Sequence, residues 1–519
     1  MSVKTGRLAK LGISCWTAHK AVWSPSRTAI RYRKRDITYQ DLESQVAACS
    51  GYLRDRLSVA PGDRIAFIGA NTPAILVLLF SSARIGAIFV PLNSRLTSPQ
   101  LNVMLDNCEP KAVFYTTPFA EKANACERAF SEITFCPLQE DGEVRRDRAV
   151  VMSELVKTET AISCDPNRDQ NVPALIAFTS GTTGTPKGAV YTQDALTFTA
   201  INGNNTYNMR GRDNVLTFLP MFHAGGLLIH TLPAIHIGAQ VTIHEDIEIA
   251  SILNEIEQNN ITLMLAPPAF SKQITAHADW NNTDLSSLRG VGIGSTFIPP
   301  EIVQAWLDRD VPAHQNYGLT EGAQIFAVPW SEHRKRITSA GTSMLYTQAR
   351  IVDEEMEPLP PGDVGEIVLR GRSLFSGYWR NDEATAAALQ DGWFKTGDVA
   401  YRDEEGFFYI VDRKKNIVIV GSSNVYPADV ERVLTEIPGV IEAAVVGVPD
   451  PAAGEALIAC LRMEESENLD IDAIIARCNT RLAAYQVPKY FICVDDFPRT
   501  SLGKIKKPDL QKLALERIG

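Results

Sequence analysis

The chain has 519 residues, too many for one ordinary hydrophobic core, so its length predicts at least two domains. Hydrophobic residues make up 45% of the sequence and charged residues 22%, a balance typical of a soluble globular protein. The formal net charge is −10, from 51 Lys and Arg against 61 Asp and Glu, which argues against nucleic acid as the main partner.

The cysteines and the apolar stretches exclude further classes. The nine cysteines are scattered without a C-x-x-C pair, so neither a disulfide framework nor a zinc site is expected. Reduced thiols are usual in the cytoplasm, where we expect the protein. The longest apolar region, Ala74–Leu92, is interrupted by Ser81, Ser82, Arg84 and Gly86 and predicts no membrane span. The basic N-terminal stretch lacks the apolar segment of a signal peptide.

The first part of the chain follows a βαβ pattern. Arg64–Gly69 is predicted as a buried strand, Thr72–Ile85 as a helix that Gly86 ends, and Ala87–Val90 as the next strand. This order indicates a parallel sheet covered by helices. Further strands are predicted at Ala112–Tyr115, Ala174–Phe178, Val215–Phe218, Gln240–Ile243 and Thr262–Leu265.

The predicted elements change character after the middle of the chain. Short strands separated by turns are predicted at Ala349–Asp353, Gly365–Arg370, Phe407–Val411 and Asn416–Val420. Past the charged run Asp412-Arg413-Lys414-Lys415, helices are predicted at Ala428–Glu436 and from Ile471, and strands at Ala443–Val448, Ala456–Met463 and Tyr490–Val494. The last part of the chain is therefore predicted to be a small α+β domain that follows a charged hinge.

The run Thr179-Ser180-Gly181-Thr182-Thr183-Gly184-Thr185-Pro186-Lys187-Gly188 follows a predicted strand. Its glycines let backbone N–H groups approach an anion, its hydroxyls add donors, and Lys187 adds a positive charge. This composition predicts a polyphosphate-binding loop. It is not a Walker A loop, because Pro186 precedes the lysine and Gly188 follows it where that motif needs Ser or Thr.

Three further motifs lie between this loop and the middle of the chain. They are Pro220-Met221-Phe222-His223-Ala224-Gly225-Gly226, Gly292-Ile293-Gly294-Ser295-Thr296-Phe297, and Gln315-Asn316-Tyr317-Gly318-Leu319-Thr320-Glu321-Gly322. His223 by itself would more often be a packed loop residue. Mg²⁺ prefers hard oxygen ligands and keeps several waters, so a carboxylate next to a hydroxyl, as in Thr320-Glu321, suffices for a Mg·ATP site.

Two motifs follow in the second half. Asp391-Gly392-Trp393-Phe394-Lys395-Thr396-Gly397-Asp398 ends in a carboxylate, which can accept hydrogen bonds from both hydroxyls of a ribose. Pro498-Arg499-Thr500-Ser501-Leu502-Gly503-Lys504 ends in a lysine that, taken alone, would be a solvated surface charge.

Together and in this order, these motifs resemble those of the acyl-adenylate-forming superfamily, which includes acyl-CoA synthetases, luciferases and the adenylation domains of peptide synthetases. The resemblance extends from Ile37-Thr38-Tyr39-Gln40-Asp41-Leu42 to Lys504 and is greatest to acyl-CoA synthetases of the 4-coumarate type. It implies an α/β fold with a large N-terminal domain of two α/β sheets and a β-barrel (1–412), a hinge (413–416) and a small mobile α+β C-terminal domain (417–519).

The resemblance also implies the site residues. Catalytic roles are implied for Lys504, Thr320, Glu321 and His223. ATP or AMP would bind at Thr179, Ser180, Gly181, Thr182, Thr183, Lys187, Gly294, Ser295, Asn316, Tyr317, Gly318, Thr320, Asp398 and Arg413. The acyl pocket would be lined by Phe222, His223, Gly294, Gln324 and Ile325. Glu321 and Thr179 would hold Mg²⁺, Lys415 would be the hinge residue, and Gly421 and Ser422 would bind CoA.

The implied activity is that of an acid–thiol ligase, which uses ATP, Mg²⁺ and CoA to turn a small carboxylic acid into an acyl-AMP and then a thioester. Gln324 hints at a polar group on the acid, and a homodimer is a family-level expectation. Because Ser422 stands where relatives often have glycine, an adenylating enzyme that loads a carrier protein in trans is the main alternative. A luciferase-type oxidase also stays open, whereas the intact motifs disfavour a binding-only relative.

Overall fold

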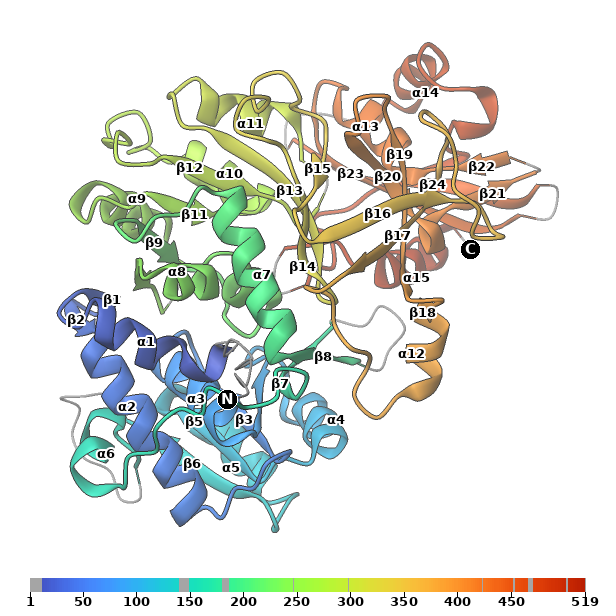
Figure 1. Cartoon of the computed structure of the whole chain (residues 1–519). Coiled ribbons are helices and arrows are strands. Elements are labelled where there is room, and N and C mark those ends of the chain that lie inside the picture. Colours follow the sequence, from blue (N-terminus) through green and yellow to red (C-terminus); the bar gives the residue numbers. More distant parts are fainter. Residues whose placement is uncertain are drawn as a thin grey trace, which may run out of the picture. The chain divides into compact units, whose positions relative to one another are not determined.

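The computed structural model describes residues 12–139, 149–179, 186–245, 247–296, 298–421, 423–450, 453–464, 470–500 and 503–518. The chain divides into two compact units, whose helices and strands are labelled in Figure 1. The first unit takes in the chain up to Thr179, Pro186–Gln348 and Arg370–Leu389. The second unit takes in Ala349–Leu369 and the chain from Gln390 onwards.

One sheet of the first unit has six strands in the order β6-β5-β3-β4-β7-β8. They are β3 (Arg64–Ile68), β4 (Ile88–Leu92), β5 (Ala112–Thr116), β6 (Thr134–Leu138), β7 (Pro173–Phe178) and β8 (Gly188–Thr192). All neighbours are parallel except β7 and β8, which form an antiparallel pair. The predicted parallel arrangement of the first strands is thus confirmed.

The helices of this part are α1 (Trp16–Trp23), α2 (Tyr39–Gly51), α3 (Pro73–Ile85), α4 (Ser98–Cys108), α5 (Ala120–Glu127) and α6 (Met152–Thr158). Helix α3 shows why the local prediction was correct. The Thr72 side chain accepts a hydrogen bond from the Ala74 N–H (3.4 Å), Pro73 occupies the first turn, and Gly86 ends the helix with a left-handed φ of +84°. Every residue of α3 is buried, as its apolar sequence requires.

The other sheet of the first unit has nine strands in the order β15-β14-β13-β12-β11-β9-β10-β1-β2. They are β1 (Thr28–Tyr32), β2 (Arg35–Thr38), β9 (Asn214–Thr217), β10 (Gln240–Ile243), β11 (Leu263–Leu265), β12 (Gly290–Ile293), β13 (Ala313–Leu319), β14 (Ala323–Ala327) and β15 (Thr342–Ser343). The strands from β13 to β1 are parallel, and the outer strands β2, β14 and β15 are antiparallel to their neighbours. The carboxyl ends of parallel strands share one edge, which gathers the predicted motifs there.

The helices between β8 and β13 are α7 (Gln193–Thr206), α8 (Thr231–Ile237), α9 (Ile249–Gln258), α10 (Pro268–Thr275) and α11 (Pro300–Leu307). Helix α7 contacts β8 of the six-stranded sheet as well as α8 and β14 of the nine-stranded sheet. It is the long green helix in Figure 1. One helix therefore packs against elements of both sheets.

The second unit contains most of a five-stranded sheet in the region where the resemblance implies a β-barrel. Its strands are β16 (Thr347–Val352), β17 (Gly365–Gly371), β18 (Leu389–Gln390), β19 (Trp393–Arg402) and β20 (Phe408–Arg413), and helix α12 (Asp382–Ala388) precedes β18. Strand β19 pairs antiparallel with both β17 and β20. Strand β20 runs further than predicted, because its pairing with β19 continues to Arg413.

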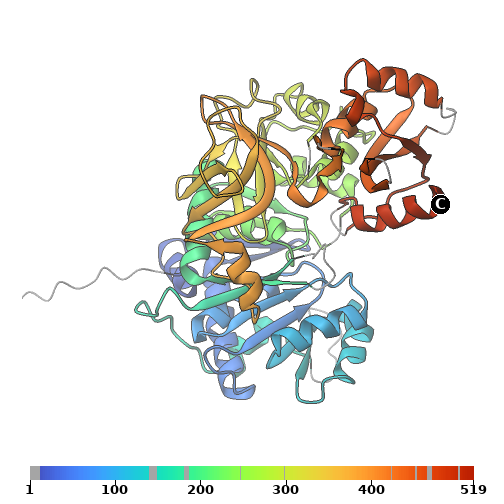
Figure 2. The ribbon, with the colours of Figure 1, turned by 90° about the vertical axis from the view of Figure 1, so that its right-hand side faces the viewer.

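The C-terminal sheet comprises β21 (Val418–Val420), β22 (Ser423–Val425), β23 (Val440–Asp450), β24 (Gly454–Met463) and β25 (Tyr490–Cys493), with helices α13 (Pro427–Thr435), α14 (Ile471–Asn479) and α15 (Lys507–Ile518). Alternate residues of β23 face opposite sides: Ala443 and Val445 pack with α13 and α14, whereas Ala444 and Val446 pack with α15. Figure 2 shows these red strands between their helices. Both faces are covered, which explains the nearly continuous apolar strands.

Two predictions of absence can be compared with the structure. All nine cysteines are free thiols, as the sequence predicts. In the part of the chain that the structure describes, no helix is both long and apolar enough to cross a membrane.

Candidate active site

The glycine-rich motif connects β7 to β8. Of its predicted ligands, Ser180, Gly181, Thr182 and Thr183 lie outside the described residues. Thr179 and Lys187 flank them, and the Thr179 N–H donates to the Lys187 carbonyl (2.8 Å) while the Lys187 N–H donates to Thr179 Oγ1 (3.4 Å). The strand pairing thus places this hydroxyl beside this lysine.

The predicted Thr320-Glu321 pair lies in the turn Thr320–Gly322 between β13 and β14, called here the Glu321 turn. A Cβ at Gly318 would lie 1.9 Å from the Ala323 carbonyl oxygen, so only glycine fits there. Ala323 itself has a left-handed φ of +55°, which non-glycine residues adopt mainly in tight turns. The sharp local backbone accounts for the glycine in this motif.

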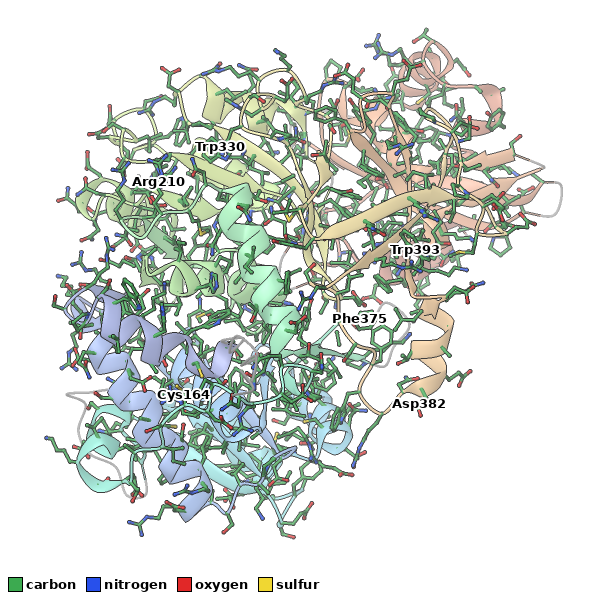
Figure 3. The ribbon with its side chains drawn as sticks, in the orientation of Figure 1. Cys164, Arg210, Trp330, Phe375, Asp382 and Trp393 are labelled. Atoms are coloured by element: carbon green, nitrogen blue, oxygen red, sulfur yellow. The ribbon has the colours of Figure 1, made fainter. Side chains whose placement is uncertain are left out.

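Two distant residues hold the backbone of the Glu321 turn. The buried Tyr191 hydroxyl, on β8, donates to the Thr320 carbonyl (2.6 Å). The Phe375 N–H donates to the Glu321 carbonyl (2.8 Å), and Phe375 is labelled in Figure 3. The turn is therefore fixed from two directions before any ligand binds.

Tyr378, which the sequence analysis missed, joins the two motifs. Its hydroxyl donates to Glu321 Oε1 (2.7 Å), and Lys187 Nζ lies 5.2 Å from the centre of its ring, within cation–π range. Burial, and then the adjacent Glu321 carboxylate, hold the pKa of Tyr378 well above its ordinary value, so the hydroxyl remains a hydrogen-bond donor. One side chain thus contacts both a predicted metal ligand and a predicted phosphate ligand.

Backbone pairing beside β8 places Tyr378. The Val190 N–H donates to the Gly377 carbonyl (3.0 Å), and the Trp379 N–H donates to the Gly188 carbonyl (2.7 Å). The segment is too short to show strand periodicity. Glycine followed by two aromatic residues in a polar stretch is the only sequence signal that could have drawn attention to it.

His223 follows β9, and its ring lies 4.6 Å from that of Phe222. The loop is held by Asn71, a buried residue between β3 and α3 of the other sheet. Asn71 Nδ2 donates to the Leu219 carbonyl (2.9 Å), and the Met221 N–H donates to Asn71 Oδ1 (2.8 Å). The sequence analysis missed Asn71, because an Asn before a Thr-Pro helix start is an ordinary local pattern.

Gly294 directly follows β12, and Asn316 directly follows the part of β13 that pairs in parallel with β12. A Cβ at Gly294 would lie 2.2 Å from Asn316 Oδ1, so the close approach requires glycine. The exposed Ser295 has a left-handed φ of +87°, and the Tyr317 ring stacks on that of Phe326 at 5.3 Å. The structure therefore brings the predicted adenine-binding residues to one edge of the sheet.

A buried polar cluster includes the predicted acyl-pocket residue Gln324, whose neighbour Ile325 is also buried. The Tyr207 hydroxyl, just after α7, accepts hydrogen bonds from Asn316 Nδ2 (3.1 Å) and Gln324 Nε2 (3.0 Å). The ring of His230 lies edge-on to Tyr207, with 4.2 Å between the ring centres. Burial raises the pKa of Tyr207 and lowers that of His230 to about 3, so both groups are neutral.

In the second unit, Asp398 and Arg413 face each other across β19 and β20. Arg413 Nε lies 3.0 Å from Asp398 Oδ1. The buried Glu366 accepts a hydrogen bond from the Gly397 N–H (3.0 Å), and its other oxygen lies 3.4 Å from Lys414 Nζ. Glu366 thus contacts the residues next to Asp398 and Arg413 in the chain, and it helps to position this predicted ribose-binding pair.

The predicted hinge has a further support in Asp412. Its Oδ1 accepts from the Arg413 N–H (2.6 Å) and from Asn416 Nδ2 (2.9 Å), and its Oδ2 accepts from the Ala428 N–H (3.1 Å) in the first turn of α13. A carboxylate at a helix N-terminus is favourable. Asp412 therefore ties both ends of the hinge segment to α13.

Lys504 lies in the segment Pro498–Lys506, called here the Lys504 hairpin, of which Ser501 and Leu502 lie outside the described residues. The Thr500 N–H donates to the Lys504 carbonyl (2.7 Å), and the Lys504 N–H donates to Thr500 Oγ1 (3.2 Å). Desolvation lowers the pKa of Lys504 to about 8, the Arg413 guanidinium acts in the same direction, and the Asp398 carboxylate opposes it. These three predicted site residues thus influence one another within the second unit.

The remaining predicted residues of this unit lie between β20 and β22. Desolvation and Arg413 also lower the pKa of Lys415 to about 8. Gly421 has a left-handed φ of +65° and donates its N–H to the Ala453 carbonyl (2.8 Å), whereas Ser422 lies outside the described residues. The predicted residues that the structure describes form two groups, one in each unit.

Comparisons with known proteins decide the family. Residues 17–379 match the AMP-binding enzyme family, and residues 429–504 match the AMP-binding enzyme C-terminal domain. This chain belongs to the AMP-binding enzyme family. The two matches cover the predicted residues of the first unit and Lys504, whereas the other predicted residues of the second unit lie between the matched ranges.

The relatives of this AMP-binding enzyme include two that are 36% identical to it. One is an indoleacetate–CoA ligase from Aromatoleum aromaticum, aligned over 506 residues, 97% of this chain and 98% of its own. The other is a feruloyl-CoA synthase from Amycolatopsis sp., aligned over 502 residues, 96% of this chain and 99% of its own. The crystal structure of ATP-bound MatB from Rhodopseudomonas palustris is similar, with a TM-score of 0.89, 26% identity, and coverage of 97% and 99%.

These findings confirm the predicted family and the mixed α/β fold with a separate C-terminal domain. They also confirm the predicted class of enzyme, an AMP-forming acyl-CoA ligase, a class that uses ATP and CoA.

Proposed function

We propose that this protein activates an aromatic carboxylic acid as its acyl-AMP and then transfers the acyl group to CoA. In the first step a carboxylate oxygen bonds to the α-phosphorus of ATP, and the bond to the bridging oxygen breaks and releases pyrophosphate. In the second step the CoA sulfur, having lost its proton, bonds to the acyl carbon, and AMP leaves. The contact of Tyr378 with both Glu321 and Lys187 is the observation that carries the proposal, because it joins two phosphate-site motifs.

The residues of the first unit suit the first step. Phosphoryl-type transfer is catalysed mainly by positioning and by neutralising charge. Lys187 and the hydroxyls that begin at Thr179 bind the phosphates, and Thr320 binds the α-phosphate. Their fixed backbone contacts support these roles, because donors held in place need no reorganisation when charge develops.

The donor set also fits a magnesium ion. The described residues contain no group of three or more His, Cys, Asp or Glu side chains able to hold a metal, so an all-protein cage is not available there. Mg²⁺ needs only one or two protein oxygens when phosphates and water complete its shell. Glu321, held by Tyr378, and Thr179 would bind it, and the ion would supply positive charge to the phosphates.

The acid is proposed to bind at Phe222, His223, Gly294, Gln324 and Ile325. His223 would face its carboxylate, and the aromatic ring of Phe222 would line the acyl portion. The aromatic class is supported by the names of the two relatives, which act on indoleacetate and on the feruloyl group.

The second unit is proposed to supply the remaining groups. Asp398 and Arg413 bind the ribose, and Lys504 adds positive charge in the first step. Lys415 is the hinge residue between a domain of residues 1–412 and one of residues 417–519, and Gly421 and Ser422 bind CoA. These roles rest on the family membership and on the mutual influence of Asp398, Arg413 and Lys504.

The test is to incubate the protein with Mg·ATP, CoA and a pooled set of aromatic and aliphatic carboxylic acids, and to identify the products by mass spectrometry. The proposal predicts an aromatic acyl-CoA together with AMP and pyrophosphate. Release of ADP, or no acid-dependent release of pyrophosphate, would contradict it. Acyl-AMP without any thioester would instead make a carrier protein the acceptor.

A further inference from the structure

Two buried polar side chains beside the His223 loop have unused hydrogen-bonding atoms. His230 is 2% exposed, and neither ring nitrogen has a hydrogen-bond partner among the described residues. Gln324 is 3% exposed, and its Oε1 likewise has no partner there. Because buried polar groups in proteins are nearly always paired, each of these two groups needs a partner that the described residues do not supply.

The hydrogen bond that Gln324 makes through Nε2 fixes the orientation of its side-chain amide, and with it the position of the unpaired Oε1. Its Nε2 donates to the Tyr207 hydroxyl (3.0 Å), which also accepts from Asn316 Nδ2 (3.1 Å). The side-chain amide is therefore held at one end, and Oε1 at the other end is an acceptor only. It can be satisfied only by a group that donates a hydrogen bond.

His230 lies at the junction of two helical segments. The π-helical turn Gly225–Ile229 ends at it, and α8 begins after it, which turns the ring against Tyr207 at 4.2 Å. Burial, and then the nearby His314, lower the pKa of His230 to about 3. The neutral ring has one nitrogen that accepts a hydrogen bond and one that donates.

A small cavity of about 10 Å³ adjoins His230, and Thr217, Gly225, Thr231 and Leu265 are among the residues that line it. One water molecule, or one N–H or O–H group of a ligand, needs roughly this space. The Thr217 and Thr231 hydroxyls are already hydrogen-bonded to each other (2.7 Å). His230 is therefore the polar side chain at this cavity that still needs a hydrogen-bond partner. Gly225 lines the cavity, and a Cβ added there would meet only Leu265, at 3.8 Å.

The charge of the surroundings restricts the ligand group. Tyr207, His230, Asn316 and Gln324 are all neutral, and His314 is too, because burial lowers its pKa to about 4. A buried ammonium or carboxylate needs an opposite charge. This cluster offers none, so the matching group is a neutral donor.

We propose that the substrate is an aromatic acid with a neutral N–H or O–H donor remote from its carboxylate, and that this donor bonds to His230 or to Gln324 Oε1, which makes these two side chains specificity-determining residues. The inference rests on the proposed function, of which it names the substrate class. Acids of the same size that lack the donor leave that buried acceptor unpaired, which is the strongest basis for rejecting an analogue.

The experiment compares two matched pairs of acids. Indole-3-acetate is paired with 1-benzothiophene-3-acetate, in which sulfur replaces the N–H, and 4-hydroxycinnamate is paired with 4-methylcinnamate. Acid-dependent release of pyrophosphate gives kcat/KM for each acid with wild-type protein and with His230→Leu and Gln324→Met. In at least one pair, wild type should prefer the donor-bearing acid by at least about tenfold. The variant that lacks the accepting side chain should bring that ratio towards one, mainly by slowing the donor-bearing acid.

His236→Leu is the matched control. His236 lies on α8, its pKa is lowered to about 4 mainly by burial, and its Nδ1 is already hydrogen-bonded to Asn204 (2.7 Å). This variant should lower the melting temperature but leave the acid ratios unchanged. Retained turnover of the donor-free acid shows that the pocket variants are folded.

The outcomes separate the inference from the proposed function. No release of pyrophosphate with any acid would contradict the function itself. Turnover with a ratio near one in both pairs would overturn the pocket inference alone and would assign the cavity to a structural water. Equal loss of the ratio in His236→Leu would overturn it too, because a general loss of packing would then explain the effect.

Discussion

The Glu321 turn of the first unit and the Lys504 hairpin of the second unit are held in different ways. The Glu321 turn is bonded by Tyr191, Phe375 and Tyr378, which come from parts of the chain far from it in sequence. The backbone bonds of the Lys504 hairpin are local: Thr500 pairs with Lys504, and the Lys506 N–H donates to the Pro498 carbonyl (2.7 Å). The Arg499 side chain also donates to Glu442 on β23 (3.1 Å), which ties the hairpin to the C-terminal sheet. Long-range contacts thus fix the backbone of the first motif, whereas local pairing closes the backbone of the second.

This difference suits the two steps of the proposed reaction. The groups that bind phosphate are needed in a constant arrangement, which long-range contacts provide. In the proposed reaction Lys504 is needed only in the first step, and its hairpin is bonded within the proposed domain of residues 417–519, so these bonds would be kept if that domain moved. We therefore expect changes at Lys504 and at the hinge to separate the two steps, and changes around Glu321 to affect metal-dependent chemistry.

The largest expected effect is that of Lys504→Ala. Loss of this positive charge should slow formation of acyl-AMP by about a hundredfold or more, while thioester formation from supplied acyl-AMP is kept. Single-turnover assays of each step test this. Lys506→Ala is the control, because Lys506 is exposed and lies 3.9 Å from Asp509. Equal loss of both steps in Lys504→Ala would refute the separation.

The same lysine predicts a pH dependence. Its pKa is lowered to about 8, so the charged form is present below that pH and is lost as the pH rises through it. The rate of acyl-AMP formation should fall about tenfold between pH 7 and pH 9. Lys504→Arg should move this decline to higher pH, because arginine stays protonated. A decline at an unchanged pH in the arginine variant would assign it to another group.

A smaller effect is expected for Lys415→Pro. Proline restricts the backbone at the predicted hinge, next to the Asn416 that Asp412 binds. Thioester formation should slow by roughly fivefold, with acyl-AMP formation little changed. Stopped reactions that quantify acyl-AMP and acyl-CoA over time would show the intermediate accumulating. No accumulation would place the hinge elsewhere in the chain.

The elements of the fold that could be predicted from the sequence are those set by local chemistry. Helix α3 was located from Thr72, its apolar run and Gly86, which act within a few residues of one another. The motifs were located from their residue types and their resemblance to a known family, and the structure places those that follow parallel strands at one edge of the sheet. Strand β20 was predicted too short, because its end depends on pairing with β19.

The supports of the site could not be predicted in this way. Tyr378 lies 57 residues from Glu321, and Asn71 lies 150 residues from Met221, so no local pattern connects them. His230 resembles an ordinary core histidine in sequence, and only the structure shows that both of its nitrogens lack partners among the described residues. Motifs identify the groups that contact substrate, whereas long-range packing decides what holds them.

The smallest expected effect is that of Tyr378→Phe, which sharpens the account of the Glu321 turn. The variant keeps the ring under Lys187 but removes the hydrogen bond to Glu321 Oε1. The Mg²⁺ concentration for half-maximal pyrophosphate release should rise about threefold, since a residue that orients a metal ligand tunes the affinity for the metal.

Tyr39→Phe is the control, because Tyr39 is a buried tyrosine whose hydroxyl donates to the Ala239 carbonyl (2.6 Å) away from the site. Both variants lose one hydrogen-bonded hydroxyl, so each unfolding free energy should fall by about 1 kcal/mol, with the larger loss at the more buried Tyr39. A shift in the Mg²⁺ requirement in both would make it a general effect of lost stability. A shift in Tyr378→Phe alone would show that long-range packing, and not the Thr320-Glu321 motif by itself, sets the position of the carboxylate.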